Sequence, residues 1–146
     1  MKIAIGSDEK THLTDFVIEN VQRRGREVEL FGPLKGEPQS WVEVGERAAL
    51  AVAQGNCAEG ILFCWTGTGI SMAANKIPGI RAALCSDAKT AEGARKWNHA
   101  NILVMSLRLT SEALASEILD AWFGTPWGNG ESVNDVARLA KIERRC

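Results

Sequence analysis

The sequence lacks the features that place a protein in a membrane or on a nucleic acid. No apolar run approaches the roughly 20 residues that a membrane span needs. No basic block occurs among the 17 Lys and Arg residues, which 18 Asp and Glu residues balance to a net charge of -1. A near-neutral surface has little attraction for nucleic acid or for an anionic membrane. We expect neither as a partner.

Cysteine and histidine are few and scattered. The cysteines are Cys57, Cys64, Cys85 and Cys146. They form no CxxC pair and have no histidine cluster beside them, which argues against a zinc site. Scattered thiols suit a reducing cytoplasm better than a disulfide framework, so we expect a cytoplasmic protein. The two lone histidines, His12 and His99, are expected to be structural or exposed.

What the chain does contain is an alternation of β-rich runs with helical patterns. This alternation predicts one domain over residues 1–146, an α/β fold with a parallel sheet covered on both faces. The predicted strands are residues 2–6, 27–31, 61–64, 81–85 and 101–105. The predicted helices begin near Thr11, Trp41, the Gly-rich turn after residue 66, Ser86 or Asp87, Thr110 or Ser111, and Glu131.

The last predicted helix, residues 131–145, has only a thin apolar face. That face consists of Val133, Val136, Ala137 and Ala140. A helix with so little apolar surface gains little by folding back onto its own chain. We expect it to dock across a partner subunit.

The most informative stretch is residues 60–80, GILFCWTGTGISMAANKIPGI. Cys64 ends an apolar strand, and a Gly-rich turn then opens a helix. Backbone NH groups of such a turn can cradle negative oxygen, and the positive end of the helix dipole points at the same place. A thiolate beside an oxyanion site suits proton abstraction next to a carbonyl. The alternatives are a structural cysteine and an ordinary tight turn.

Other polar residues follow the strands of the predicted sheet, where ligands of open α/β sheets collect. Asp8 follows the first strand and Arg108 follows the fifth. Asp8 could hydrogen-bond sugar hydroxyls or instead cap a helix, and Arg108 could pair with an anionic ligand or instead form an ordinary surface ion pair. Trp97 and Asn98 end a helix that we expect near the same rim. Trp97 could stack on a sugar or simply cover the core.

Together these segments resemble the ribose-5-phosphate isomerase type B family, which includes the galactose-6-phosphate isomerase subunits. The resemblance covers nearly the whole chain, and residues 60–80, 81–87 (RAALCSD) and 97–108 (WNHANILVMSLR) carry it. It implies a three-layer, flavodoxin- or Rossmann-like sheet of five parallel strands. It also implies a homodimer or dimer of dimers with active sites shared between subunits.

The activity that the resemblance implies is aldose–ketose isomerisation of a sugar or sugar phosphate through a cis-enediol, with no metal and no cofactor. By position, Cys64 matches the family's cysteine base, and the loop from Thr66 to Ser71 matches the one that holds the enediolate oxygens. The predicted catalytic residues are Cys64 and Thr66. The predicted substrate-binding residues are Asp8, Glu9, Gly67, Thr68, Gly69, Ser71, Trp97, Asn98 and Arg108.

The chain departs from the family at four places, three of which the resemblance associates with phosphate or with opening of the sugar ring. Glu9 replaces a histidine that touches phosphate, and Trp97 replaces the histidine that helps to open the furanose ring. Ser40–Trp41–Val42 stands in place of Asp-Tyr-Pro. Acidic residues of the segment 131–135 replace an arginine–histidine cluster.

Each lost charge-assisted contact removes roughly 1.5–3 kcal/mol of attraction for phosphate, unless Arg138, Arg144 or Arg145 substitutes. We therefore expect an isomerase whose substrate differs from ribose 5-phosphate: open-chain, short, or not phosphorylated at the usual end. The alternative is a non-catalytic sugar-binding or regulatory subunit of the same fold. An unrelated flavodoxin-like domain with a structural cysteine is a third possibility.

Overall fold

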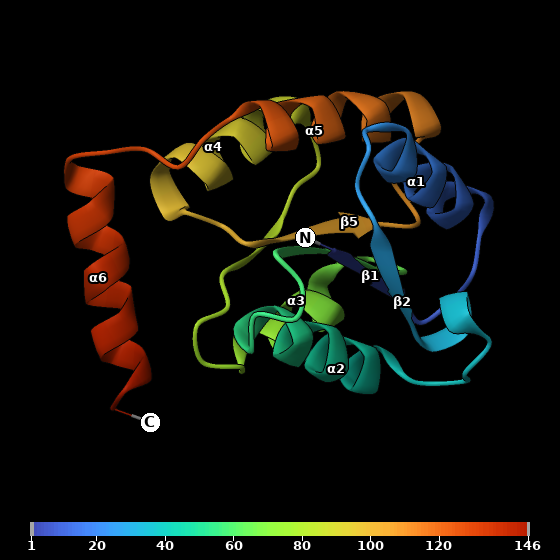
Figure 1. The fold of residues 1–146 in the computed structure, drawn as a ribbon, viewed down its shortest axis with the longest axis horizontal. Helices are drawn as coiled ribbons and strands as arrows, with labels where there is room; N and C mark the ends of the chain where they lie inside the picture. Colours follow the sequence, from blue (N-terminus) through green and yellow to red (C-terminus); the bar gives the residue numbers. More distant parts are fainter. Residues whose placement is uncertain (1, 146) are drawn as a thin grey trace.

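The computed structural model describes residues 2–145 and contains one sheet of five parallel strands (Figure 1). The strands are β1 (Ile3–Ser7), β2 (Val28–Phe31), β3 (Glu59–Cys64), β4 (Ala82–Leu84) and β5 (Ile102–Ser106), in the order β2-β1-β3-β5-β4. The predicted α/β fold with five parallel strands is confirmed. All strands run the same way, so the sheet has one carboxyl edge and one amino edge.

The order of the last two strands differs from the flavodoxin order, in which the fourth strand lies beside the third. Here β5 lies between β3 and β4. This order agrees with the burial of the two strands. Every residue of β5 is buried, whereas β4 has only three residues, none of them buried. A short, partly exposed strand is suited to a sheet edge.

Helices cover both faces of the sheet and make the three layers (Figure 1). One layer holds α1 (His12–Arg23), α4 (Ala88–Asn98) and α5 (Glu112–Gly124), and the other holds α2 (Trp41–Ala53) and α3 (Thr68–Asn75). A short 3-10 helix, Gly32–Lys35, links β2 to α2. The last helix, α6 (Glu131–Glu143), belongs to neither layer and stands beside the end of α4, next to the β4 edge.

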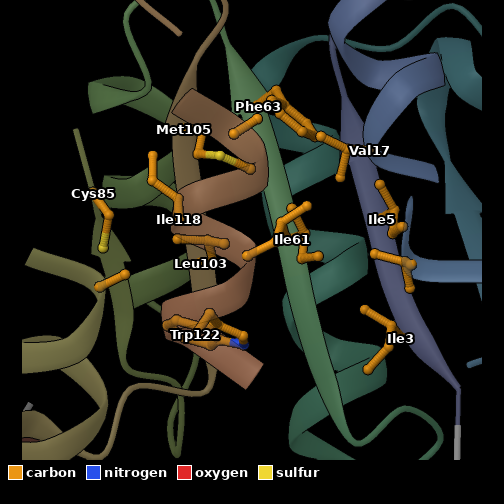
Figure 2. Close-up of a cluster of buried hydrophobic side chains, with 14 of the residues drawn as sticks. Ile3, Ile5, Val17, Ile61, Phe63, Cys85, Leu103, Met105, Ile118 and Trp122 are labelled. Atoms are coloured by element: carbon orange, nitrogen blue, oxygen red, sulfur yellow. The ribbon is translucent and has the colours of Figure 1, made fainter. Parts of the chain in front are cut away.

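The core consists of two clusters, one on each face of the sheet, because alternate strand residues point to opposite faces. Figure 2 shows the first, in which Leu103 lies beside Ile118 and Trp122 of α5, and Ile5 lies beside Val17 of α1. The second cluster packs strand residues against α2 and α3 and includes Ala4, Leu62, Val104, Val44 and Ile70. Burial on both faces explains the nearly continuous apolar runs of the central strands.

Most helices begin at a side chain that satisfies a free backbone NH group. The hydroxyl of Ser111 accepts from Leu114 NH, and the carboxylate of Asp87 accepts from Thr90 NH, so both helices begin where the sequence predicts. Thr11 and Ser40 cap α1 and α2 in the same way. Helix α3 has no such cap, because its N-cap residue is Gly67, and α6 likewise begins after Gly130 without one. The first NH groups of α3 remain available for another acceptor.

None of the helices formed by residues 2–145 is long and apolar enough to cross a membrane.

Candidate active site

Cys64 is the last residue of β3, at the carboxyl edge of the sheet. Cys64 is 5% exposed, so it is buried except for a small area that solvent can reach. The carbonyl of Cys64 accepts a hydrogen bond from Leu107 NH (3.0 Å), and that of Trp65 accepts from Arg108 NH (3.0 Å) and from the Ser106 hydroxyl (2.9 Å). The end of β5 thus fixes the backbone on which Cys64 lies.

The turn after Cys64 brings the uncapped start of α3 to the same edge. Gly67 has a φ of +82°, and a Cβ atom there would lie 2.5 Å from Cδ1 of Leu84. Only glycine fits this turn without strain. The hydroxyls of Thr66 and Thr68 are hydrogen-bonded to each other (2.8 Å), while Gly69 and Ser71 follow within the first turn of α3. We call residues 65–71 the cradle, because its NH groups and the helix dipole favour an anion there.

Asp8 and Glu9 lie at the same edge, directly after β1. The Ser7 hydroxyl donates to the carbonyl of Glu9 (2.6 Å), and Ser7 pairs with Phe63, the residue before Cys64. Asp8 is half-buried, and this burial raises the pKa of its carboxyl group, with a smaller contribution from the charge of Glu9. Asp8 does not cap α1, since Thr11 does. Its carboxyl group therefore remains available for a ligand.

Arg108 is the cation nearest in sequence to this edge of β5. Its backbone NH contacts Trp65, its side chain is exposed, and it forms no ion pair within residues 2–145. The ion-pair alternative for Arg108 is therefore absent from the described part of the chain. An exposed guanidinium beside the cradle is free to meet an anionic ligand.

The expectation that Trp97 and Asn98 lie near this rim is wrong within one chain. Helix α4 starts after β4 at the carboxyl edge, runs back along the sheet and ends at Asn98, just before β5 begins. Cys64 pairs with Ser106 at the other end of β5, and the four steps from Ile102 to Ser106 span about 13 Å. The two predicted substrate-binding residues therefore lie toward the opposite, amino edge from Cys64.

That amino edge holds a cluster of residues that the sequence alone does not reveal. The ring of His99 stacks on Trp127, with centroids 5.2 Å apart, and its Nε2 lies 3.0 Å from the Gly128 carbonyl and 3.1 Å from the Ser132 hydroxyl. The expected structural role of His99 is confirmed, whereas His12 is exposed. These contacts join the end of α4 to the start of α6.

Two arginines complete the cluster. The guanidinium of Arg95 lies over the rings of Trp122 (4.8 Å) and Trp127 (5.6 Å), and Arg81 lies over Trp127 (5.3 Å). Arg95 also forms an ion pair with Glu59 (2.6 Å), in which the side chains are only 14% and 15% exposed. Burial lowers the pKa of both arginines, which stay charged at any ordinary pH. The sequence shows only a tryptophan after Pro126, and this pattern does not indicate which side chains contact the indole ring.

The other described cysteines are buried thiols without any sign of chemistry. Cys57 and Cys85 are each 1% exposed and form no disulfide. Burial raises the pKa of Cys85 to about 12, so this thiol stays protonated at neutral pH. Figure 2 shows its sulfur inside the core. Within residues 2–145, no three His, Cys, Asp or Glu side chains are grouped to hold a metal ion.

Helix α6 leaves a groove of about 950 Å³ between itself and the β4 edge. Asn98, Arg81, Leu84, Leu139 and Ile142 are among the residues that line it. The far end of α6 lies at Gly79, whose NH donates to the Glu143 carboxylate (3.0 Å). Arg138 of α6 is exposed, and so are Arg144 and Arg145, which follow directly after this helix.

Comparison with known proteins defines the class of this fold and site. The profile of the Ribose/Galactose Isomerase family matches residues 3–142. Ribose-5-phosphate isomerase B of Escherichia coli K12 is 37% identical over 99% of this chain and 97% of its own. D-erythrulose-4-phosphate isomerase of Pectobacterium atrosepticum is 33% identical over the same shares.

A solved structure, that of Clostridium thermocellum ribose-5-phosphate isomerase B, superposes with a TM-score of 0.93 at 38% identity, covering 99% of both chains. The chain belongs to the ribose/galactose isomerase family. It is accordingly an enzyme of the aldose–ketose isomerase class.

Proposed function

We propose that this protein interconverts the aldose and ketose forms of a sugar phosphate, with Cys64 as the base. The Cys64 thiolate takes the proton from C2 of the aldose, and the electron pair left behind forms the C1=C2 bond as the C1 carbonyl oxygen becomes an enediolate oxygen. The same thiol returns the proton to C1. The proton of the C2 hydroxyl passes to O1, which leaves a carbonyl at C2 and balances the reaction.

The observation that carries this proposal is the uncapped start of α3 next to the thiol. Cys64 ends β3, and three residues later Gly67 begins a helix whose first NH groups have no side-chain partner. One such donor to an oxyanion typically contributes about 10²–10³ in rate. Thr66 and Thr68 add hydroxyls, and Asp8 adds a carboxyl group, to hold the substrate's own hydroxyls.

We propose further that the substrate is a short sugar phosphate that is open-chain in solution. Glu9 adds an exposed negative charge where the family has a phosphate-binding histidine, and Trp97 replaces the histidine that opens the ring. A four-carbon sugar with its phosphate on O4 cannot close a five-membered ring, so it needs no ring-opening residue. The relative from Pectobacterium atrosepticum, named for erythrulose 4-phosphate, supports this choice.

We propose that the active site is completed by a second copy of the chain. Trp97 and Asn98 lie toward the amino edge of their own sheet, so they can meet the cradle only in another subunit. Helix α6 lies outside both helix layers, and the groove beside it offers an apolar surface on which another subunit can dock. Arg138 of α6, with Arg144 and Arg145 just after it, then becomes a candidate to bind the phosphate of the partner's substrate.

The test of the reaction is a panel of four- and five-carbon aldose and ketose phosphates, followed by NMR for interconversion. We expect the four-carbon pair to be turned over, ribose 5-phosphate to be turned over far more slowly, and Cys64→Ala to be inactive. Efficient turnover of ribose 5-phosphate would contradict the substrate assignment. Sugar binding without any turnover would identify a non-catalytic subunit.

The test of the shared site is a mixing experiment with two inactive variants, Cys64→Ala and Asn98→Ala. Unfolding and refolding them together gives hybrid dimers with one intact site, and about a quarter of the wild-type activity should return. A mixture that stays inactive would place both residues in the site of one chain.

A further inference from the structure

A large aromatic side chain borders the cradle without a role in the reaction described so far. Trp41 is the first residue of α2, and it is 41% exposed. A Cβ atom built on Gly69 would lie 3.1 Å from Cδ2 and Cε3 of the indole and 3.3 Å from Cζ3. The six-membered ring of Trp41 therefore lies directly against the backbone of the second residue of α3.

The position of this ring is fixed by the close approach of two helices. One turn further along α2, a Cβ atom on Gly45 would lie 2.9 Å from Cβ of Ala73 and 3.2 Å from the Ile70 carbonyl. The helices can come this close only because Gly45 and Gly69 lack side chains at the contact. The Ser40 hydroxyl caps α2 at the Glu43 NH (3.3 Å) and so holds the backbone at Trp41.

Packing of the core does not account for Trp41. It belongs to neither core cluster of the described residues, and more than a third of it faces solvent. On the other side of the cradle, Leu84 lies against Gly67, as the 2.5 Å approach to a Cβ there shows. The cradle's NH groups are thus bordered by an indole on the α2 side and by an aliphatic side chain on the β4 side.

This arrangement matches the two kinds of surface that a sugar chain presents. Its oxygens need donors, which the cradle supplies, and its carbon-bound hydrogens pack well on an aromatic face. We propose that Trp41 contacts the carbon chain of the bound sugar phosphate and holds its oxygens toward the cradle. This inference rests on the proposed function, because it takes the ligand of the cradle to be a sugar phosphate.

The test measures binding separately from turnover. Erythronate 4-phosphate, a four-carbon sugar acid that cannot be isomerised, is titrated by calorimetry into wild type, Trp41→Phe, Trp41→Ala and Val42→Ala. Val42 is the matched control, since it is the next residue of α2 and is 44% exposed. We expect Kd to rise about tenfold in Trp41→Ala, the equivalent of about 1.4 kcal/mol, to rise less in Trp41→Phe, and to stay unchanged in Val42→Ala.

In turnover of the four-carbon substrate, KM should rank the variants in the same order as Kd does. KM should be higher in Trp41→Ala, and kcat should change less than KM. A wild-type Kd in folded Trp41→Ala, an equal loss in Val42→Ala, or no binding by wild type would each overturn the inference. The proposed function fails on a different result: the sugar acid binds in a Trp41-dependent way, but no sugar is isomerised in a Cys64-dependent way.

Discussion

The polar groups at the two edges of the sheet differ in whether they have partners within the chain. At the amino edge, His99, Arg95 and Arg81 each contact hydrogen-bond acceptors and the Trp127 ring, and Glu59 pairs with Arg95. At the carboxyl edge, α3 has no side-chain cap, and neither Asp8 nor Arg108 forms an ion pair within residues 2–145.

This contrast separates stability from function in the molecule. Asp8 is half-buried and Arg108 is exposed, so water can solvate their charges and leaving them without a protein partner costs the fold little free energy. The contacts of the amino edge hold α4, α6 and the sheet together, while the unpaired groups of the carboxyl edge are the ones to which the proposed function assigns the substrate. Substitutions at the amino edge should accordingly lower mainly the free energy of unfolding, and substitutions at the carboxyl edge should lower turnover.

The largest loss of stability is expected at the amino edge, in Arg95→Met. This change removes the ion pair with Glu59 and leaves that carboxylate largely buried without its partner. We expect the free energy of unfolding to fall by about 3 kcal/mol, since one partner of a buried pair is lost. Denaturant unfolding measures it, with Glu59→Gln as the milder matched change. A loss below about 1 kcal/mol would show that the amino edge does not stabilise the fold as described.

A smaller loss is expected in Gly67→Ala at the carboxyl edge. The left-handed backbone at φ +82° costs a non-glycine residue about 1–2 kcal/mol, and the new Cβ meets Leu84. Both the free energy of unfolding and kcat/KM should fall. The double variant Gly67→Ala/Leu84→Ala removes the clash but not the backbone strain. Recovery to wild-type stability in the double variant would show that no strain is stored in the backbone.

The smallest change in stability is expected in Asp8→Asn, and this change is a gain rather than a loss. The pKa of Asp8 lies above its ordinary value of 3.8 because of burial, so folding favours the protonated form. The cost of ionising this carboxyl group in the folded state therefore develops as the pH rises from about 3.8 through the raised pKa, and it is fully present above that pKa. Asp8→Asn should have a slightly higher Tm than wild type at pH 7 and no such gain below about pH 3.8, although turnover falls. A lower Tm at pH 7 would mean that Asp8 stabilises the fold.

The sequence predicts most of this architecture because local patterns determine it. Strand and helix positions follow from the apolar periodicity, and the cradle follows from the order strand, Gly-rich turn, helix. The place of β5 between β3 and β4 does not follow, because it depends on how much of each strand is buried in the finished sheet. The position of Trp97 was within reach of sequence reasoning, since a helix between parallel strands always returns to the amino edge.

The amino-edge cluster illustrates what a sequence cannot show. His99 and Gly128 are 29 residues apart, and only the packing of α4 beside α6 brings them together. The Trp41–Gly69 contact has the same origin, because it arises from the approach of α2 to α3 at Gly45. Both are contacts between helices, and helix contacts depend on crossing geometry rather than on any local motif.

In the proposed reaction, the thiol of Cys64 moves a proton between C1 and C2 of a sugar phosphate. The most direct test is NMR in D2O of a four-carbon sugar phosphate incubated with wild type, Cys64→Ala and the buried-thiol control Cys85→Ala. We predict that deuterium enters at C1 or C2 with wild type and Cys85→Ala, and not with Cys64→Ala. Exchange by Cys64→Ala at the wild-type rate would show that Cys64 is not the base.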